Sequence, residues 1–103
     1  MAIKLTDEQI KNYSDPYGLD IPFENPNGDD YSAIFLSPRY CNNEFWSEFV
    51  KLKGWDIEGN YELDYDELCA GMEKAAKDGE ASDIDILLYD YLASGKAWDD
   101  KNG

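Results

Sequence analysis

The sequence predicts a small, mainly α domain in which three to four amphipathic helices follow an irregular N-terminal arm rich in proline and glycine. Three observations support this fold class. The length of 103 residues is typical of one domain, 1–103. Apolar residues recur every three to four positions in three segments, and capping residues precede the helices. A brief strand pair would make the domain α+β, and the sequence leaves that alternative open.

The N-terminal helix and the arm are predicted from capping residues and prolines. Thr6 and Gln9 form a capping box, so a short helix is expected to run to about Tyr13. Prolines then disfavour a helix and lack the backbone N–H that a β-sheet needs. The segment from Gly18 to Gly28 is therefore expected to be an irregular arm. Two apolar residues are its expected anchors, Ile21 and Phe23.

The middle of the chain contains one predicted helix between two ambiguous segments. The run YSAIFL, residues 31–36, is too short to distinguish a buried strand from one or two helical turns. An apolar stripe predicts a helix over about 43–53 that ends at Gly54. Residues 55–63 alternate loosely, so they form either a brief hairpin or a plain loop.

The C-terminal third carries the two best-defined helices. Asp64 and Glu67 have the spacing of a second capping box, and Gly79 is placed to end the helix that they begin. Ser82 caps the next helix, whose apolar residues follow the spacing of a single buried stripe. Gly95 is expected to close it.

The charge balance excludes several classes of partner. There are 23 Asp and Glu against 9 Lys and Arg, which gives a formal net charge of −14. Direct binding to nucleic acid or to an anionic membrane is therefore disfavoured. The N-terminus lacks the features of a secretory signal, and no stretch is long enough to span a bilayer. The protein is expected to remain in the cytoplasm.

The residue types present argue against an enzyme. The chain has no histidine, which removes the usual proton carrier and the common nucleophilic triads. Cys41 and Cys69 are too few for a zinc cluster and lack a CxxC spacing, so both are interpreted as reduced core residues. No cofactor and no catalytic residue is expected.

The acidic residues are concentrated between Gly54 and Gly95, a segment that contains twelve Asp and Glu but only two lysines. Asp66 and Glu73, and likewise Asp83 and Asp90, are seven residues apart on a predicted helix. Seven residues of helix correspond to a rise of roughly 10 Å, which is the length of about three base-pair steps of DNA. Tyrosines and one isoleucine are interleaved with these acids. The residues expected to contact a partner are Asp56, Glu58, Tyr61, Glu62, Asp64, Tyr65, Asp66, Glu73, Asp83, Ile86, Tyr89 and Asp90.

In size, charge and lack of catalytic groups, the chain resembles the small acidic inhibitors of phages and mobile elements, namely anti-CRISPR proteins and antirestriction DNA mimics. The resemblance implies a non-enzymatic inhibitor that acts in a bacterial host cell. Its partner would be a basic nucleic-acid-binding protein: a nuclease, a CRISPR effector or a restriction enzyme. A bacterial immunity protein that neutralises a basic toxin uses the same electrostatics and is the nearest alternative.

A second alternative is a calcium site. Residues 56–67 have the length of an EF-hand loop, with oxygen ligands at the first, third and fifth positions and Glu67 at the twelfth. Two departures weaken the pattern. Tyr61 stands at the sixth position, where the loop needs glycine, and Glu58 stands at the third position in place of the shorter Asp or Asn. The capping role of Asp64 also explains part of the pattern without a metal.

Overall fold

The computed structural model describes residues 2–19, 21, 33–39 and 41–102. These residues form helices and strands in the order β1 (Ala2–Lys4), α1 (Asp7–Tyr13), the 3-10 helix η1 (Pro16–Gly18), β2 (Ala33–Leu36), α2 (Asn43–Lys53), β3 (Tyr61–Asp64), α3 (Tyr65–Asp78), β4 (Glu80–Ser82), α4 (Asp83–Ala93) and α5 (Lys96–Asn102). The prediction of a mainly α domain is wrong. The fold is α+β, with five α-helices and two small antiparallel sheets among the described residues.

Both sheets are two-stranded and join segments that are far apart in the sequence. β1 pairs with β4, with Ile3 opposite Ala81. β2 pairs with β3, with Ile34 opposite Leu63. The ambiguous run 31–36 therefore contains a strand, and residues 55–63 form no local hairpin because the partner of β3 is β2. Such pairings leave no local turn signal in the sequence.

The predicted helix starts are confirmed. Thr6 and Gln9 form the complete capping box of α1. The side chains of Asn42, Asp64 and Ser82 each accept a backbone N–H at the start of α2, α3 and α4. The predicted helix ends at Gly54 and Gly79 are also confirmed, and both glycines adopt the left-handed conformation that ends a helix.

The predicted irregular arm lies mostly outside the described residues. Just before it, Pro16–Gly18 forms a 3-10 turn, in line with the turn that the sequence Asp15-Pro16-Tyr17-Gly18 predicts. Ile21 is buried, as expected of an anchor. Phe23, the other expected anchor, lies outside the described residues.

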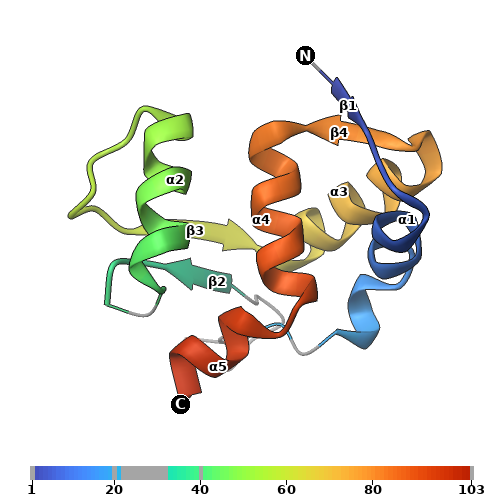
Figure 1. The fold of residues 1–103 in the computed structure, drawn as a ribbon. Helices are drawn as coiled ribbons and strands as arrows, with labels where there is room; N and C mark the ends of the chain where they lie inside the picture. The colour runs from blue at the N-terminus through green and yellow to red at the C-terminus, as the bar shows by residue number, and fades with distance from the viewer. Residues whose placement is uncertain (1, 20, 22–32, 40, 103) are drawn as a thin grey trace.

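Helix α4 runs through the middle of the molecule (Figure 1). α2 and the β2–β3 pair lie on one side of it, and α1 and α3 lie on the other. α4 also packs against β4 at its start and α5 at its end. This position follows from its composition, because the sequence DIDILLYDYLA is apolar on more than one face. A helix of this kind is stable when neighbours cover it from several sides.

An aromatic cluster holds α2 against β3. Phe49 is fully buried, and its ring packs against Trp46 and, edge to face, against Tyr61. Trp55 packs against Trp46 and Tyr61 at centroid distances of 5.8 and 5.1 Å. The indole N–H of Trp46 donates to the carbonyl of Ile57 at 2.6 Å, which ties the loop after α2 back onto that helix. Aromatic pairs of this geometry add to the energy of burial.

Three buried tyrosines pack around α4, and their phenols have raised pKa values. Burial raises the pKa of Tyr89 to about 12, with a contribution from Asp85. Burial and a hydrogen bond to Asp90 raise the pKa of Tyr13, while burial and a hydrogen bond to Asp100 raise that of Tyr91. The folded protein therefore holds these phenols neutral at pH values where an exposed tyrosine ionises.

We expect steep unfolding in alkali. An unfolded tyrosine ionises near pH 10, so above this pH the unfolded state loses protons that the folded state retains. The stabilisation is complete below about pH 10 and is lost as the pH rises toward the folded pKa values. Far-UV circular dichroism and tyrosinate absorbance, followed together against pH, should change in one transition. Full tyrosinate absorbance in a protein that keeps its helical signal would contradict the burial of these phenols.

Candidate functional site

A groove of about 950 Å³ lies between α2, α4 and α5 in the described part of the molecule. We call it the acidic groove. It is lined by Asn42, Glu44, Phe45, Glu48, Asp83, Ile86, Leu87, Asp90, Tyr91, Ser94, Lys96, Asp99 and Asp100. Its volume lies at the upper end of the range typical of ligand and peptide sites.

The rim of the acidic groove carries a large excess of negative charge. Six carboxylates line it, and Lys96 is the one cation among the described lining residues. Glu44 and Glu48 lie one turn apart on α2, Asp83 and Asp90 lie on α4, and α5 contributes Asp99 and Asp100. Each helix that borders the groove thus presents two acids to it, so a cation approaching from any of the three sides is attracted.

The floor of the acidic groove is apolar. The ring of Tyr91 stacks on Phe45 with centroids 3.8 Å apart and planes 6° apart, and both side chains are buried. Ile86 and Leu87 lie beside them on α4 and are only half-buried. Apolar atoms that a partner could cover therefore lie between the carboxylates.

Asp100 fixes α5 to the other two walls of the groove. Its Oδ2 accepts a hydrogen bond from the Tyr91 hydroxyl at 2.5 Å and one from the Asn42 side-chain amide at 2.8 Å. The bond from Tyr91 is the main cause of the lowered pKa of Asp100, since it favours the charged form. A single carboxylate therefore links α5 to both the start of α2 and the end of α4.

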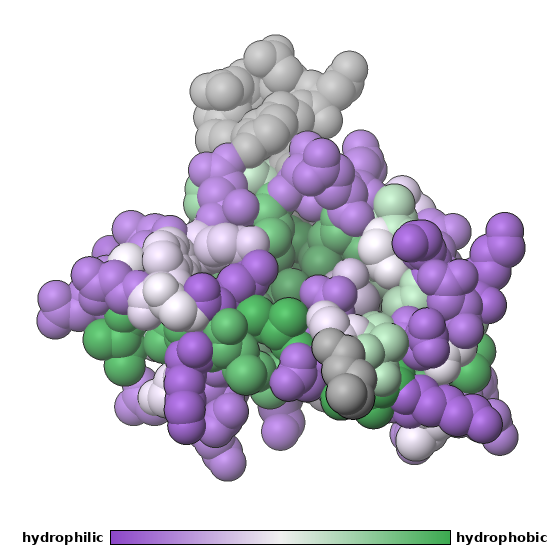
Figure 2. Space-filling model, turned by 90° about the horizontal axis from the view of Figure 1, so that it is seen from above, coloured by the Kyte–Doolittle hydropathy of each residue, from purple (hydrophilic) through white to green (hydrophobic). Residues whose placement is uncertain are grey.

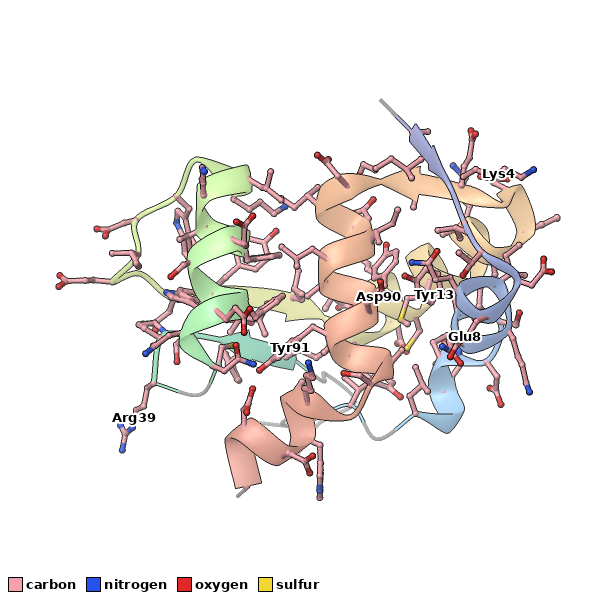
Figure 3. The ribbon with its side chains drawn as sticks, viewed as in Figure 1. Lys4, Glu8, Tyr13, Arg39, Asp90 and Tyr91 are labelled. Carbon is pink, nitrogen blue, oxygen red and sulfur yellow. The ribbon has the colours of Figure 1, made fainter. Side chains whose placement is uncertain are left out.

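Asp90 has a structural role at the opposite edge of the groove. Its carboxylate accepts hydrogen bonds from the Tyr13 hydroxyl and, at 3.1 Å, from the side-chain amide of Gln9. Figure 3 shows Asp90 and Tyr13 directed toward each other between α4 and α1, whereas Tyr91 extends toward α2. Asp90 therefore contributes charge to the rim and also connects α1 to α4.

The structure brings three of the predicted contact residues, Asp83, Ile86 and Asp90, together in the acidic groove. The prediction that Tyr89 is an exposed contact is wrong, because only 7% of its surface is exposed. Tyr89 packs edge to face against Tyr13, with ring centroids 5.4 Å apart. Its position was misjudged because α4 was expected to bury a single stripe, whereas it is covered from both sides.

The side chain of Tyr89 reaches from α4 to α3 and explains a mid-helix glycine. A Cβ added at Gly71 would lie 2.6 Å from the hydroxyl oxygen of Tyr89. Real Cβ atoms do not approach an oxygen so closely, so only glycine lets the buried phenol fit against α3. Tyr89 is thus part of the core that positions α4.

Four other predicted residues lie in or beside the β3 region, away from the groove lining. Asp56 and Glu58 are exposed in the turn after α2, where the Asp56 carboxylate accepts the Glu58 N–H at 3.0 Å. Glu62 is exposed on β3, opposite Phe35. Tyr61 is half-buried in the aromatic cluster, and Lys53 lies over its ring.

The four remaining predicted residues belong to α3 and its cap. Asp64 is the N-cap of the helix and accepts the Glu67 N–H at 3.0 Å. Tyr65 packs edge to face against Tyr17, which is 54% exposed. The pKa of Tyr17 is raised, first by partial loss of solvent around the phenol, and then by Cys69, Asp66 and Glu73 nearby. These residues form a second acidic and aromatic surface on α3 and η1.

The loop 56–67 does not gather the ligands of an EF-hand. Within the described part of the chain, no three Cys, Asp or Glu side chains lie close enough together to hold a metal ion. Residues 61–64 are extended in β3, and Asp64 is already engaged as a helix cap. The structure therefore gives no support to the calcium alternative.

Both cysteines are free and buried, as predicted. Burial is the largest cause of the raised pKa of each thiol, in Cys41 and in Cys69. A thiol in such surroundings is a poor nucleophile. The cysteines thus serve as small core residues.

Sequence reasoning missed four of the six carboxylates of the acidic groove. The acids that it overlooked lie outside the segment 54–95, and they are Glu44, Glu48, Asp99 and Asp100. One signal was present for the pair on α2, since two glutamates four residues apart on a helix repel each other and weaken it. The apolar stripe of α2 indicates only which face of that helix is buried, and these glutamates lie outside the stripe.

Apolar surface is also exposed on the face of the molecule that is seen from above. Figure 2 shows green patches there between hydrophilic side chains. Leu52 and Ile3 are 43% and 46% exposed. Among the described residues, no helix has the length and apolar composition needed to cross a membrane.

Comparison with protein-family models, with curated proteins and with solved structures gives no match to this chain. The geometry and charge of the acidic groove are therefore the features that point to a function.

Proposed function

We propose that the protein is a non-enzymatic inhibitor that binds a basic nucleic-acid-binding protein, such as a nuclease or a CRISPR or restriction complex. The acidic groove is the site of contact, and its occupation blocks the binding of DNA. The observation that carries this proposal is the gathering of six carboxylates and one ammonium around an apolar floor. A surface of this kind is complementary to a cationic, partly apolar protein surface.

The electrostatics of the acidic groove favour rapid capture of such a partner. The net charge of −14 sets up a long-range field, and the three acidic walls focus it on the groove. A cationic protein is steered to this surface before any close contact forms. Nucleic acid, which carries the same sign of charge, is repelled and competes for the same partner.

The arrangement of the acids also supports mimicry of a nucleic acid. Asp83 and Asp90 are seven residues apart on α4, a rise of roughly 10 Å, which is about three base-pair steps. Glu44 and Glu48 form a second row on α2, across the groove. Two rows of anions that border a groove reproduce the way in which phosphates border the grooves of DNA.

Capture from a bacterial lysate tests the proposal. The immobilised protein is expected to retain a cationic protein that excess duplex DNA displaces. The affinity of the purified partner should fall at least about tenfold between about 50 mM and about 500 mM salt, because exposed charges are screened over about 8 to 10 Å in ordinary buffers. Titration calorimetry at both salt concentrations measures this change.

Two results would contradict the proposal. One is a partner whose affinity is the same at both salt concentrations, since the acidic groove would then contribute nothing. The other is a partner that binds DNA and this protein at the same time, as a ternary complex in gel shift. A partner that is released by DNA but not by neutral dextran supports it.

A further inference from the structure

We infer that the element of the partner that enters the acidic groove is a basic amphipathic helix, with lysines or arginines on its flanks and an aliphatic side chain between them. This inference rests on the proposed function and adds the chemistry of the occupant. It follows from the way in which charge and apolar surface alternate across the groove.

The charge of the groove lies on both sides of its floor. Glu44 and Glu48 border it on α2, Asp83 and Asp90 border it on α4, and Asp99 lies at the α5 end. An occupant that carried cations along one edge only would leave one acidic wall without a partner. Complementarity thus requires cations on two flanks.

The floor between these walls requires an apolar contact. Ile86 and Leu87 are half-buried there, next to the stacked rings of Phe45 and Tyr91. A purely hydrophilic occupant would place water or a desolvated cation over these side chains. An aliphatic side chain covers them at a gain in free energy, as in other grooves that bind helices.

A helix meets both requirements, whereas an extended chain does not. In a helix, residues three and four apart share one face, and the residues between them lie on the two flanks. A strip of leucines can thus rest on the floor while lysines on either side reach the carboxylates. In an extended chain, alternate side chains point to the floor and away from it, so half of the cations would face solvent.

Two synthetic peptides of identical composition test this inference. Each has about 18 residues of lysine, alanine and leucine, a length sufficient for a helix. One peptide is amphipathic, and in the other the order is scrambled so that leucine and lysine share every face. Fluorescence anisotropy of labelled peptides against the full-length protein is expected to show at least about tenfold tighter binding of the amphipathic peptide, because one leucine is buried.

Variants of the protein locate the site. Ile86→Ser should remove the preference for the amphipathic peptide, while Ile57→Ser, at an isoleucine that is 52% exposed in the loop after α2, should preserve it. Glu44→Gln with Glu48→Gln should weaken binding of both peptides. These two glutamates are exposed, so this variant is expected to fold even if Ile86→Ser does not.

The outcomes distinguish the inference of a helical occupant from the proposed function. Equal, salt-sensitive binding of both peptides overturns the helix inference and preserves the proposed function. A preference for the amphipathic peptide that survives Ile86→Ser, in a variant with normal circular dichroism, also overturns the inference. If neither peptide binds at low salt, the groove is no site for cations and the proposed function fails with it.

Discussion

Replacing four carboxylates of the acidic groove by their amides is expected to weaken partner binding about 100-fold. The substitutions are Glu44→Gln, Glu48→Gln, Asp83→Asn and Asp99→Asn, all at exposed side chains that line the groove. Each rim charge contributes roughly 0.5 to 1 kcal/mol, so four of them contribute roughly 2 to 4 kcal/mol. Calorimetric titration of the partner measures the loss, most of which should appear in the association rate at low salt.

A matched variant separates groove charge from total charge. Glu58→Gln, Glu67→Gln, Glu73→Gln and Glu80→Gln remove the same number of charges from exposed positions outside the groove. This control should retain binding within about threefold, because screening confines the influence of remote charges. Equal weakening by the two variants would show that only net charge matters, and that no particular surface is recognised.

Asp90 and Asp100 are left unchanged in both variants for a structural reason. Asp90 accepts hydrogen bonds from α1, and Asp100 joins α5 to α2 and α4. Loss of either charge would weaken the packing of the helices that form the groove. A drop in affinity would then report on folding and on charge together.

The helices that the sequence predicted are those with local signals at one or both ends. Thr6 with Gln9, and Asp64 with Gly79, are recognised from residues a few positions apart, and the structure confirms them. The strand pairs were not predicted because strands such as β1 and β4 are short and lie far apart in the sequence. α5 was missed for a different reason, since KAWDDKN has neither a cap nor an apolar stripe, and it buries Ala97 against α4.

The candidate site could be predicted only in part, because tertiary packing decides which acids meet. Asp83 and Asp90 were recognised from their spacing on one helix. Their neighbours in space, Glu48 and Asp99, come from other helices, and no local pattern links them to α4. Tyr89 was misassigned because the sequence shows that α4 is apolar but does not show how many neighbours cover it.

The largest effect on stability is expected from Phe49→Ala. Phe49 is fully buried between α2 and β3, and it contacts Phe45, Trp46 and Tyr61. Truncation of such a residue costs about 3 to 5 kcal/mol, because it leaves a cavity in a close-packed cluster. Domains of this size are stable by about 5 to 15 kcal/mol, so the change removes a large share of the free energy of unfolding. Urea unfolding followed by tryptophan fluorescence measures it.

Phe49→Ala is also expected to disturb the acidic groove. Phe49 anchors α2, and α2 carries the acidic row of Glu44 and Glu48. Loss of the aromatic cluster should therefore weaken partner binding even at temperatures where the variant remains folded. Leu52→Ala is the control on the same helix, since Leu52 is 43% exposed and its truncation should cost about 1 kcal/mol or less. If Leu52→Ala destabilised the protein as much as Phe49→Ala, the aromatic cluster would not be what positions α2.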